Sequence, residues 1–98
     1  MAAAASASTT GVRPGTALEA ALRQEMHSIA HLARSQGEIK EALAAGDDAE
    51  LAQAYAENVG VLQRKRVRAA DLQRQVDAAA NRPARTDQEI LRALFPDD

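Results

Sequence analysis

The chain has 98 residues, a net charge of −2 and no cysteine, which limits it to one small domain and excludes disulfide bridges, thiol chemistry and cysteine-based zinc sites. Its 46% hydrophobic content includes one tyrosine, one phenylalanine and no tryptophan, and much of it is alanine, which buries little area per residue. Such a thin core predicts helix packing, with a partner or a second copy adding stability.

The first segment, residues 1–15, is built of small residues and carries Arg13 as its only charge. This composition predicts a disordered N-terminal tail. A short organelle presequence is the alternative, because such segments lack acidic residues and are rich in small ones. No apolar run along the chain approaches the ~20 residues of a membrane span, so we expect no membrane contact.

Three helices follow, at about residues 17–45, 48–80 and 87–95. Gly46 is expected to end the first helix within a turn at 46–48, and NRPARTD (81–87) breaks the chain before the third, leaving a linker at 81–86. Each helix start combines a capping oxygen with a glutamate three residues later. The three pairs are Thr16 with Glu19, Asp47 with Glu50, and Thr86 with Glu89.

Both long helices carry a mainly apolar stripe at alternating spacings of four and three residues, which is typical of a coiled-coil seam. When the two stripes are paired in antiparallel order, the two residue numbers of each pair have the same midpoint, residue 47. Asp47 lies inside the turn that the glycine and the capping residues predict independently. The predicted fold is therefore all-α: an antiparallel two-helix coiled-coil hairpin spanning residues 16–80, with a short C-terminal third helix. The paired positions are Leu43 with Leu51, Ile39 with Tyr55, Gln36 with Asn58, Leu32 with Leu62, Ile29 with Lys65, Glu25 with Ala69, Leu22 with Leu72, and Leu18 with Val76.

Polar residues and glycines interrupt both stripes at one level. Gln36 and Asn58 are predicted to form a polar layer that sets the register, because a slip would bury an amide against an apolar side chain. Gly37 and Gly60 lie near the same level. They either tolerate exposure without a role, or form a waist where a partner backbone approaches closely or the arms bend.

Two pairs of ionisable residues stand on or beside the seam. His27 and His31 have the i,i+4 spacing of metal-binding helices, yet Ser28 stands where the HExxH pattern needs glutamate. They are interpreted as surface histidines, so no metal and no cofactor is expected. Glu25 and Lys65 occupy adjacent layers and are either an ion pair or two side chains that extend separately to solvent.

The second helix carries a basic stretch. Residues 61–85 hold seven Lys/Arg against two Asp/Glu, whereas residues 38–57 hold one Lys against six acidic residues. The hairpin is thus predicted to be acidic at its tip and basic along the far half of its second arm. This polarity suits docking to a partner in one direction, or antiparallel self-pairing in which acidic tips meet basic stems. The residues proposed for this basic face are Arg64, Lys65, Arg66, Arg68 and Arg74, and RKRVR (64–68) also matches a loose nuclear-localisation pattern.

The third helix gathers large apolar residues on one side and ends before Pro96. It either folds back over the open end of the hairpin or docks into a partner's groove. The anchors for either role are Ile90, Leu91, Leu94 and Phe95.

No catalytic or phosphate-binding motif is present, and a two-helix ribbon offers no cleft for a small-molecule substrate. The sequence therefore favours a non-enzymatic interaction protein, a small complex subunit or assembly adaptor inside the cell, in the cytoplasm or nucleus. It would present its hairpin to a helical partner or to its own copy. The alternative is a binder of a polyanion, either nucleic acid or an acidic protein tail, through residues 64–74.

Overall fold

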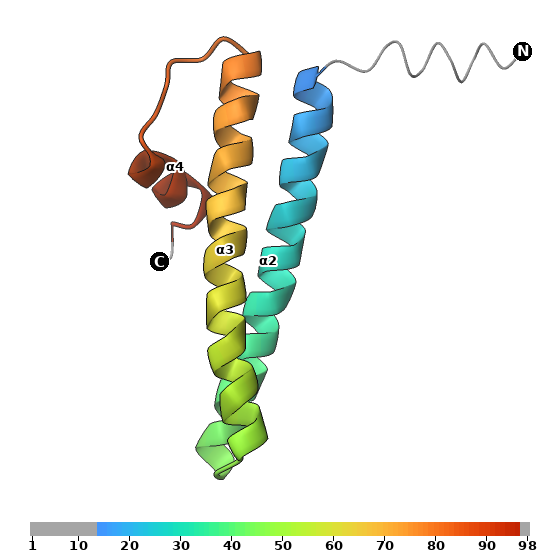
Figure 1. Ribbon diagram of the computed structural model, residues 1–98, viewed down its shortest axis with the longest axis vertical. Coiled ribbons are helices and arrows are strands. Elements are labelled where there is room, and N and C mark those ends of the chain that lie inside the picture. The colour runs from blue at the N-terminus through green and yellow to red at the C-terminus, as the bar shows by residue number, and fades with distance from the viewer. Residues whose placement is uncertain (1–13, 97–98) are drawn as a thin grey trace, which may run out of the picture. The chain divides into compact units, whose positions relative to one another are not determined.

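A computed structural model describes residues 14–96, and there the chain forms α2 (Pro14–Ala45), α3 (Ala49–Ala79) and α4 (Asp87–Leu94) (Figure 1). Two long helices pack against each other and a short third helix follows, so the predicted fold class is confirmed. Residues 1–13, which make up most of the predicted N-terminal tail, lie outside the described residues. The chain divides into two compact units, residues 24–69 and residues 14–23 with 70–96, and each is described separately.

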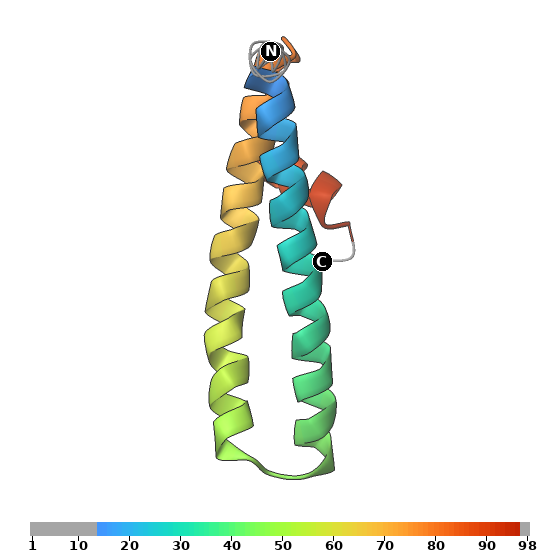
Figure 2. The same ribbon diagram turned by 90° about the vertical axis from the view of Figure 1, so that its right-hand side faces the viewer.

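The unit of residues 24–69 contains the turn between α2 and α3, visible in Figure 2. The Gly46 amide donates to the Leu43 carbonyl at 3.3 Å and closes the last turn of α2. The carboxylate of Asp48 then accepts hydrogen bonds from the amides of Glu50 (3.0 Å) and Leu51 (3.1 Å) at the start of α3. The capping oxygen thus satisfies amides that the first helical turn leaves without partners.

Three local expectations are corrected. The cap of α3 is Asp48 and not Asp47; adjacent aspartates have equal capping chemistry, and the sequence does not distinguish them. Thr16 lies within α2, which begins at Pro14, because the fixed φ of proline suits the first helical turn. α2 ends before Gly46 as expected, but Gly46 does not adopt the positive φ that is common at a glycine C-cap.

The predicted seam matches the burial pattern. Every seam position of α2 and α3 is buried or half-buried, whereas most positions between them are exposed. In the unit of residues 24–69, Ile29 (4% exposed) and Ala69 (0%) are the buried apolar residues. The seam is thin because most of its side chains are only half-buried, so it buries little apolar area for its length.

In the other unit, the end of α3 is closed by Asn81, which has φ 58°. The Arg82 amide donates to the Asp77 carbonyl at 2.9 Å and the Asn81 amide to the Ala78 carbonyl at 3.1 Å. This pair of bonds defines a Schellman motif, in which asparagine takes the left-handed position usually given to glycine. The linker is thereby directed away from the helix axis.

The start of α4 has the capping box that the sequence predicts. The Thr86 hydroxyl accepts from the Glu89 amide at 3.1 Å, and the Glu89 carboxylate accepts from the Thr86 amide at 2.8 Å. Hydrogen bonds to the Glu89 carboxylate, from the Thr86 backbone amide first and then from the Thr86 side chain, hold the pKa of Glu89 below its ordinary value. α4 is therefore defined locally, by its own cap.

α4 packs within its own chain. Ile90 is completely buried (0% exposed), and Asp87 pairs with Arg74 of α3. Ala70 is buried although it lies beside the seam and not on it, which indicates that α4 covers the face of α3 next to the α2 contact. Leu91, Leu94 and Phe95 are half-buried.

We expect Ile90→Ala to lower the free energy of unfolding by about 2 to 4 kcal/mol, because it removes three carbons from a fully buried site. Urea denaturation followed by circular dichroism measures the change. Gln88→Ala, at an exposed position of the same helix, should leave the midpoint nearly unchanged. Equal effects of the two substitutions would contradict the packing of α4.

Candidate functional site

The polar layer is partly as predicted. Gln36 is buried (7% exposed), and its Nε2 donates to the Tyr55 carbonyl across the seam at 3.0 Å. Its Oε1 is buried without a hydrogen-bond partner among the described residues, so no amide of Asn58 reaches it. Asn58 is half-buried on the facing helix. The hydrogen bond of Gln36 across the seam therefore runs to the backbone of Tyr55 and not to the side chain of Asn58.

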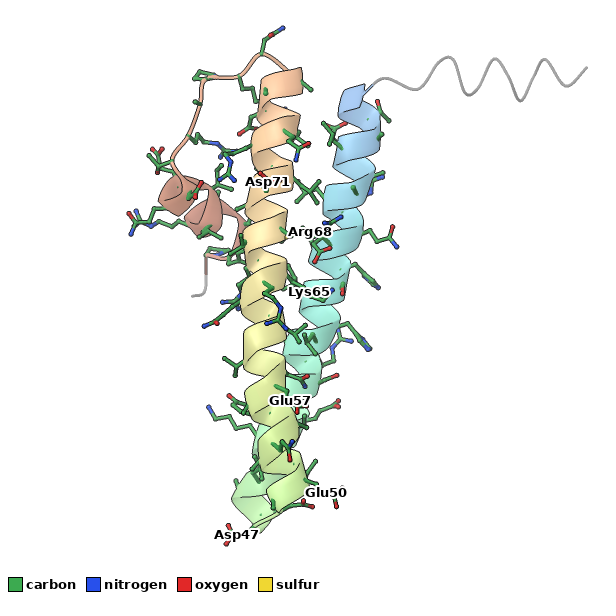
Figure 3. All side chains as sticks on the ribbon, viewed as in Figure 1. Asp47, Glu50, Glu57, Lys65, Arg68 and Asp71 are labelled. Carbon is green, nitrogen blue, oxygen red and sulfur yellow. The ribbon has the colours of Figure 1, made fainter. Side chains whose placement is uncertain are left out.

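Lys65 and Arg68 both turn toward Glu25 of α2 (Figure 3). The distances are 3.6 Å from Lys65 Nζ to Glu25 Oε2 and 3.4 Å from Arg68 Nε to Glu25 Oε1, and the Glu25 side chain is only 13% exposed. The ion-pair interpretation of Glu25 and Lys65 is therefore confirmed, with Arg68 as an additional partner. A shielded carboxylate between two cations gives the hairpin an electrostatic contact beside its apolar seam.

The basic stretch is dispersed, not gathered on one face. Lys65 and Arg68 are engaged by Glu25, Arg74 pairs with both Asp71 and Asp87, and Arg66 is half-buried. Only Arg64 among the five is exposed without an ion pair in residues 14–96. At about 100° of rotation per residue these positions also point in different directions around α3. Counting charges along the sequence overstates the basic surface.

The acidic tip differs from the basic stretch, because its carboxylates stay exposed. Asp47 and Glu50 lie at the turn and Glu57 two turns further along α3 (Figure 3). Glu57 accepts a hydrogen bond from Gln53 at 3.3 Å, and no cation pairs with these three within the described chain. The acidic surface predicted from the sequence is therefore present.

The most exposed large apolar side chains lie on α3. Val67 is 65% exposed and Val59 is 39% exposed. Val67 shares one helical face with Ala56, Gly60 and Gln63, at alternating spacings of four and three residues, on the side of α3 away from the seam. We call these four residues the outer face of α3. None of the four residues is charged. Ala56, Gln63 and Val67 are exposed, and Gly60 is half-buried, with Arg64 Nη1 3.5 Å from the position of an added Cβ.

In the other unit, a buried carboxylate is surrounded by hydrogen-bond donors, a cluster that was not predicted from the sequence. Asp77 is 3% exposed and accepts from Gln73 (3.0 Å), Arg82 (3.1 Å) and Arg85 (2.8 and 3.1 Å). Burial alone would raise the pKa of Asp77, but the hydrogen bonds from Arg85, Gln73 and Arg82 together outweigh it and lower that pKa below its ordinary 3.8. This cluster fastens the linker onto α3. The i,i+4 spacing of Gln73 and Asp77 was the one signal of it in the sequence.

His27 and His31 are both exposed on α2. Within residues 14–96 no group of three or more histidine, cysteine or acidic side chains is placed to hold a metal ion. The described helices also include none that is long and apolar enough to cross a bilayer. The features that remain for a functional site are the outer face of α3 and the exposed acidic tip.

We expect Gln36→Leu to raise the free energy of unfolding by about 1 kcal/mol, because it removes a buried oxygen that has no hydrogen-bond partner. Equilibrium denaturation checks this, with Glu38→Leu at an exposed position as the control. A loss of stability would show instead that the bond to Tyr55 contributes more than the orphaned oxygen costs.

We expect Asp77→Asn to lower the free energy of unfolding at neutral pH by about 1 to 2 kcal/mol, because it weakens the hydrogen bonds from Arg82 and Arg85. The loss is modest because both guanidinium groups are partly exposed to solvent. Because the folded state lowers the pKa of Asp77, the ionised carboxylate stabilises the fold at pH values above its ordinary pKa of 3.8. This contribution is lost as the pH falls below 3.8 and through the lowered pKa. The gap between the variant and the natural chain should therefore close in acid. Thermal melts from pH 7 to pH 2.5 measure it, with the exposed Asp71→Asn as control. A gap that is independent of pH would contradict this assignment.

A comparison of the chain with protein-family models, with curated proteins and with solved structures gave no match. No family is therefore assigned. The functional argument starts from the contacts, burial and charges of the described residues alone.

Proposed function

We propose that the chain is a non-enzymatic interaction protein, a small complex subunit or assembly adaptor, that presents its hairpin to a helical partner or to its own copy. One observation carries the proposal: Val67, 65% exposed, projects from the uncharged outer face of a helix whose opposite side is closed by α2. A helix face without charged residues at its centre, on the side that α2 leaves open, suits contact with a second helix.

The thin core supports the same proposal. The buried apolar residues of the described chain are Ile29, Ala69, Ala70, Leu72, Val76 and Ile90. Two of these are alanines, so the area buried within the chain is small for helices of 32 and 31 residues. A second contact on α3 would add apolar burial that the hairpin lacks, and such a protein would work inside the cell, in the cytoplasm or nucleus.

The alternative, a polyanion binder, has weaker support. Such a site needs several free cations on one surface. Glu25 engages Lys65 and Arg68, and the carboxylates of Asp71 and Asp87 engage Arg74. Binding there would have to break these pairs, which places this function second.

Site-specific photo-crosslinking in the native host tests the proposal. A photoreactive residue replaces Val67, and a matched control replaces His27, which is exposed on α2 at the same level of the hairpin. We expect discrete adducts from position 67 and few from position 27. Their masses identify either a second copy or another protein. Absence of adducts from position 67, in a chain that retains its helical circular dichroism, would contradict the proposal.

A further inference from the structure

We propose that the outer face of α3 binds the same face of a second copy, in antiparallel orientation, across a two-fold axis. This inference rests on the proposed function and names its partner. Ala56, Gly60, Gln63 and Val67 form the contact, and Glu57 and Arg64 flank it along one edge.

The first argument is the absence of charge on this face. Ala56, Gly60, Gln63 and Val67 follow the spacing of a second coiled-coil stripe, although they are exposed or half-buried. The outward side of α2 differs, since it carries Arg34, Glu38 and Glu41. A helix surface that faces only solvent is not stabilised by the absence of charged side chains. The centre of a helix–helix contact, in contrast, is depleted in charged residues.

The second argument concerns Gly60. Glycine in a helix interior costs about 1 kcal/mol relative to alanine. Its φ is not positive, so no backbone requirement explains it. A Cβ added there would meet only Arg64 Nη1 at 3.5 Å, an ordinary contact, so packing within the chain does not require glycine. A second helix crossing at this level would use the missing side chain for close approach.

The third argument is charge complementarity. Glu57 and Arg64 are exposed on the same edge and lack ion pairs within residues 14–96. They lie two helical turns apart, about 10 Å along the axis, too far to pair within one chain. In an antiparallel pair with two-fold symmetry, edge residues meet their counterparts on the same edge. The alignment that places Ala56 against Val67 of the second copy also brings Glu57 within two residues, about 3 Å along the axis, of the level of Arg64 of the second copy, which these long side chains can span.

Symmetry makes each of these contacts occur twice, which gives two apolar contacts and two flanking ion pairs. Gly60 then faces Gln63 of the second copy near the axis. Because one short helix face is smaller than a typical stable interface, we expect a weak dimer that exchanges with monomer. Its dissociation constant should rise with salt, because exposed ion pairs are screened.

Sedimentation equilibrium on the full chain tests the interface through charge reversal. Glu57→Arg alone and Arg64→Glu alone each place like charges at both flanking positions, so each variant should dimerise roughly tenfold more weakly. A one-to-one mixture of the two single variants restores both pairs and should dimerise as the natural chain does. The variant carrying both substitutions should also dimerise normally.

Glu38→Arg and Arg34→Glu, on the exposed side of α2, are the matched controls and should leave dimerisation unchanged. Circular dichroism must show equal helicity throughout, which is expected because none of the substituted residues lies in the seam.

A natural chain that is monomeric and helical at every concentration would overturn self-pairing, while crosslinks to another protein at position 67 would still support the proposed function. A dimer insensitive to the reversals at 57 and 64, or a mixture that is not rescued, would place the interface elsewhere. Crosslinks absent at position 67 would remove both proposals.

Discussion

The narrow seam between α2 and α3 is the constraint on which the other features depend. Most of its apolar side chains are only half-buried, so apolar burial alone leaves the hairpin with little preference for one register. Polar contacts supply that preference: the buried Gln36 amide binds the Tyr55 backbone, and Glu25 is held between Lys65 and Arg68. In a thin interface such contacts determine alignment more than they add stability.

The end of α3 is likewise held mainly by polar contacts. Asn81 adopts the left-handed conformation, and the resulting change of direction brings Arg82 and Arg85 onto the buried carboxylate of Asp77. The linker is thus held by hydrogen bonds where a larger domain would use apolar packing. α4 is capped by Thr86 and buries Ile90 in its own unit, so its apolar side is largely used within the chain. That leaves the outer face of α3 as the open surface for a partner.

The helices, the turn and the seam could be predicted because each depends on local spacing: alternating apolar residues, capping oxygens and glycine. The capping residue of α3 could not, since Asp47 and Asp48 are chemically alike. The partners of the basic stretch could not either, because which carboxylate reaches Lys65, Arg68 or Arg74 depends on packing between segments distant in sequence. Asp77 escaped notice for the same reason, as its cluster forms only once the linker turns back.

In the proposed dimer, α3 packs on α2 with one side and on a second copy with the other. Methyl NMR of valine-labelled chain over a dilution series measures whether both sides of α3 are in contact. We expect the Val67 methyl signals to shift with concentration, while those of Val76, 5% exposed within its own unit, stay fixed. Val67 signals that do not change with concentration, or equal shifts at both residues, would contradict it.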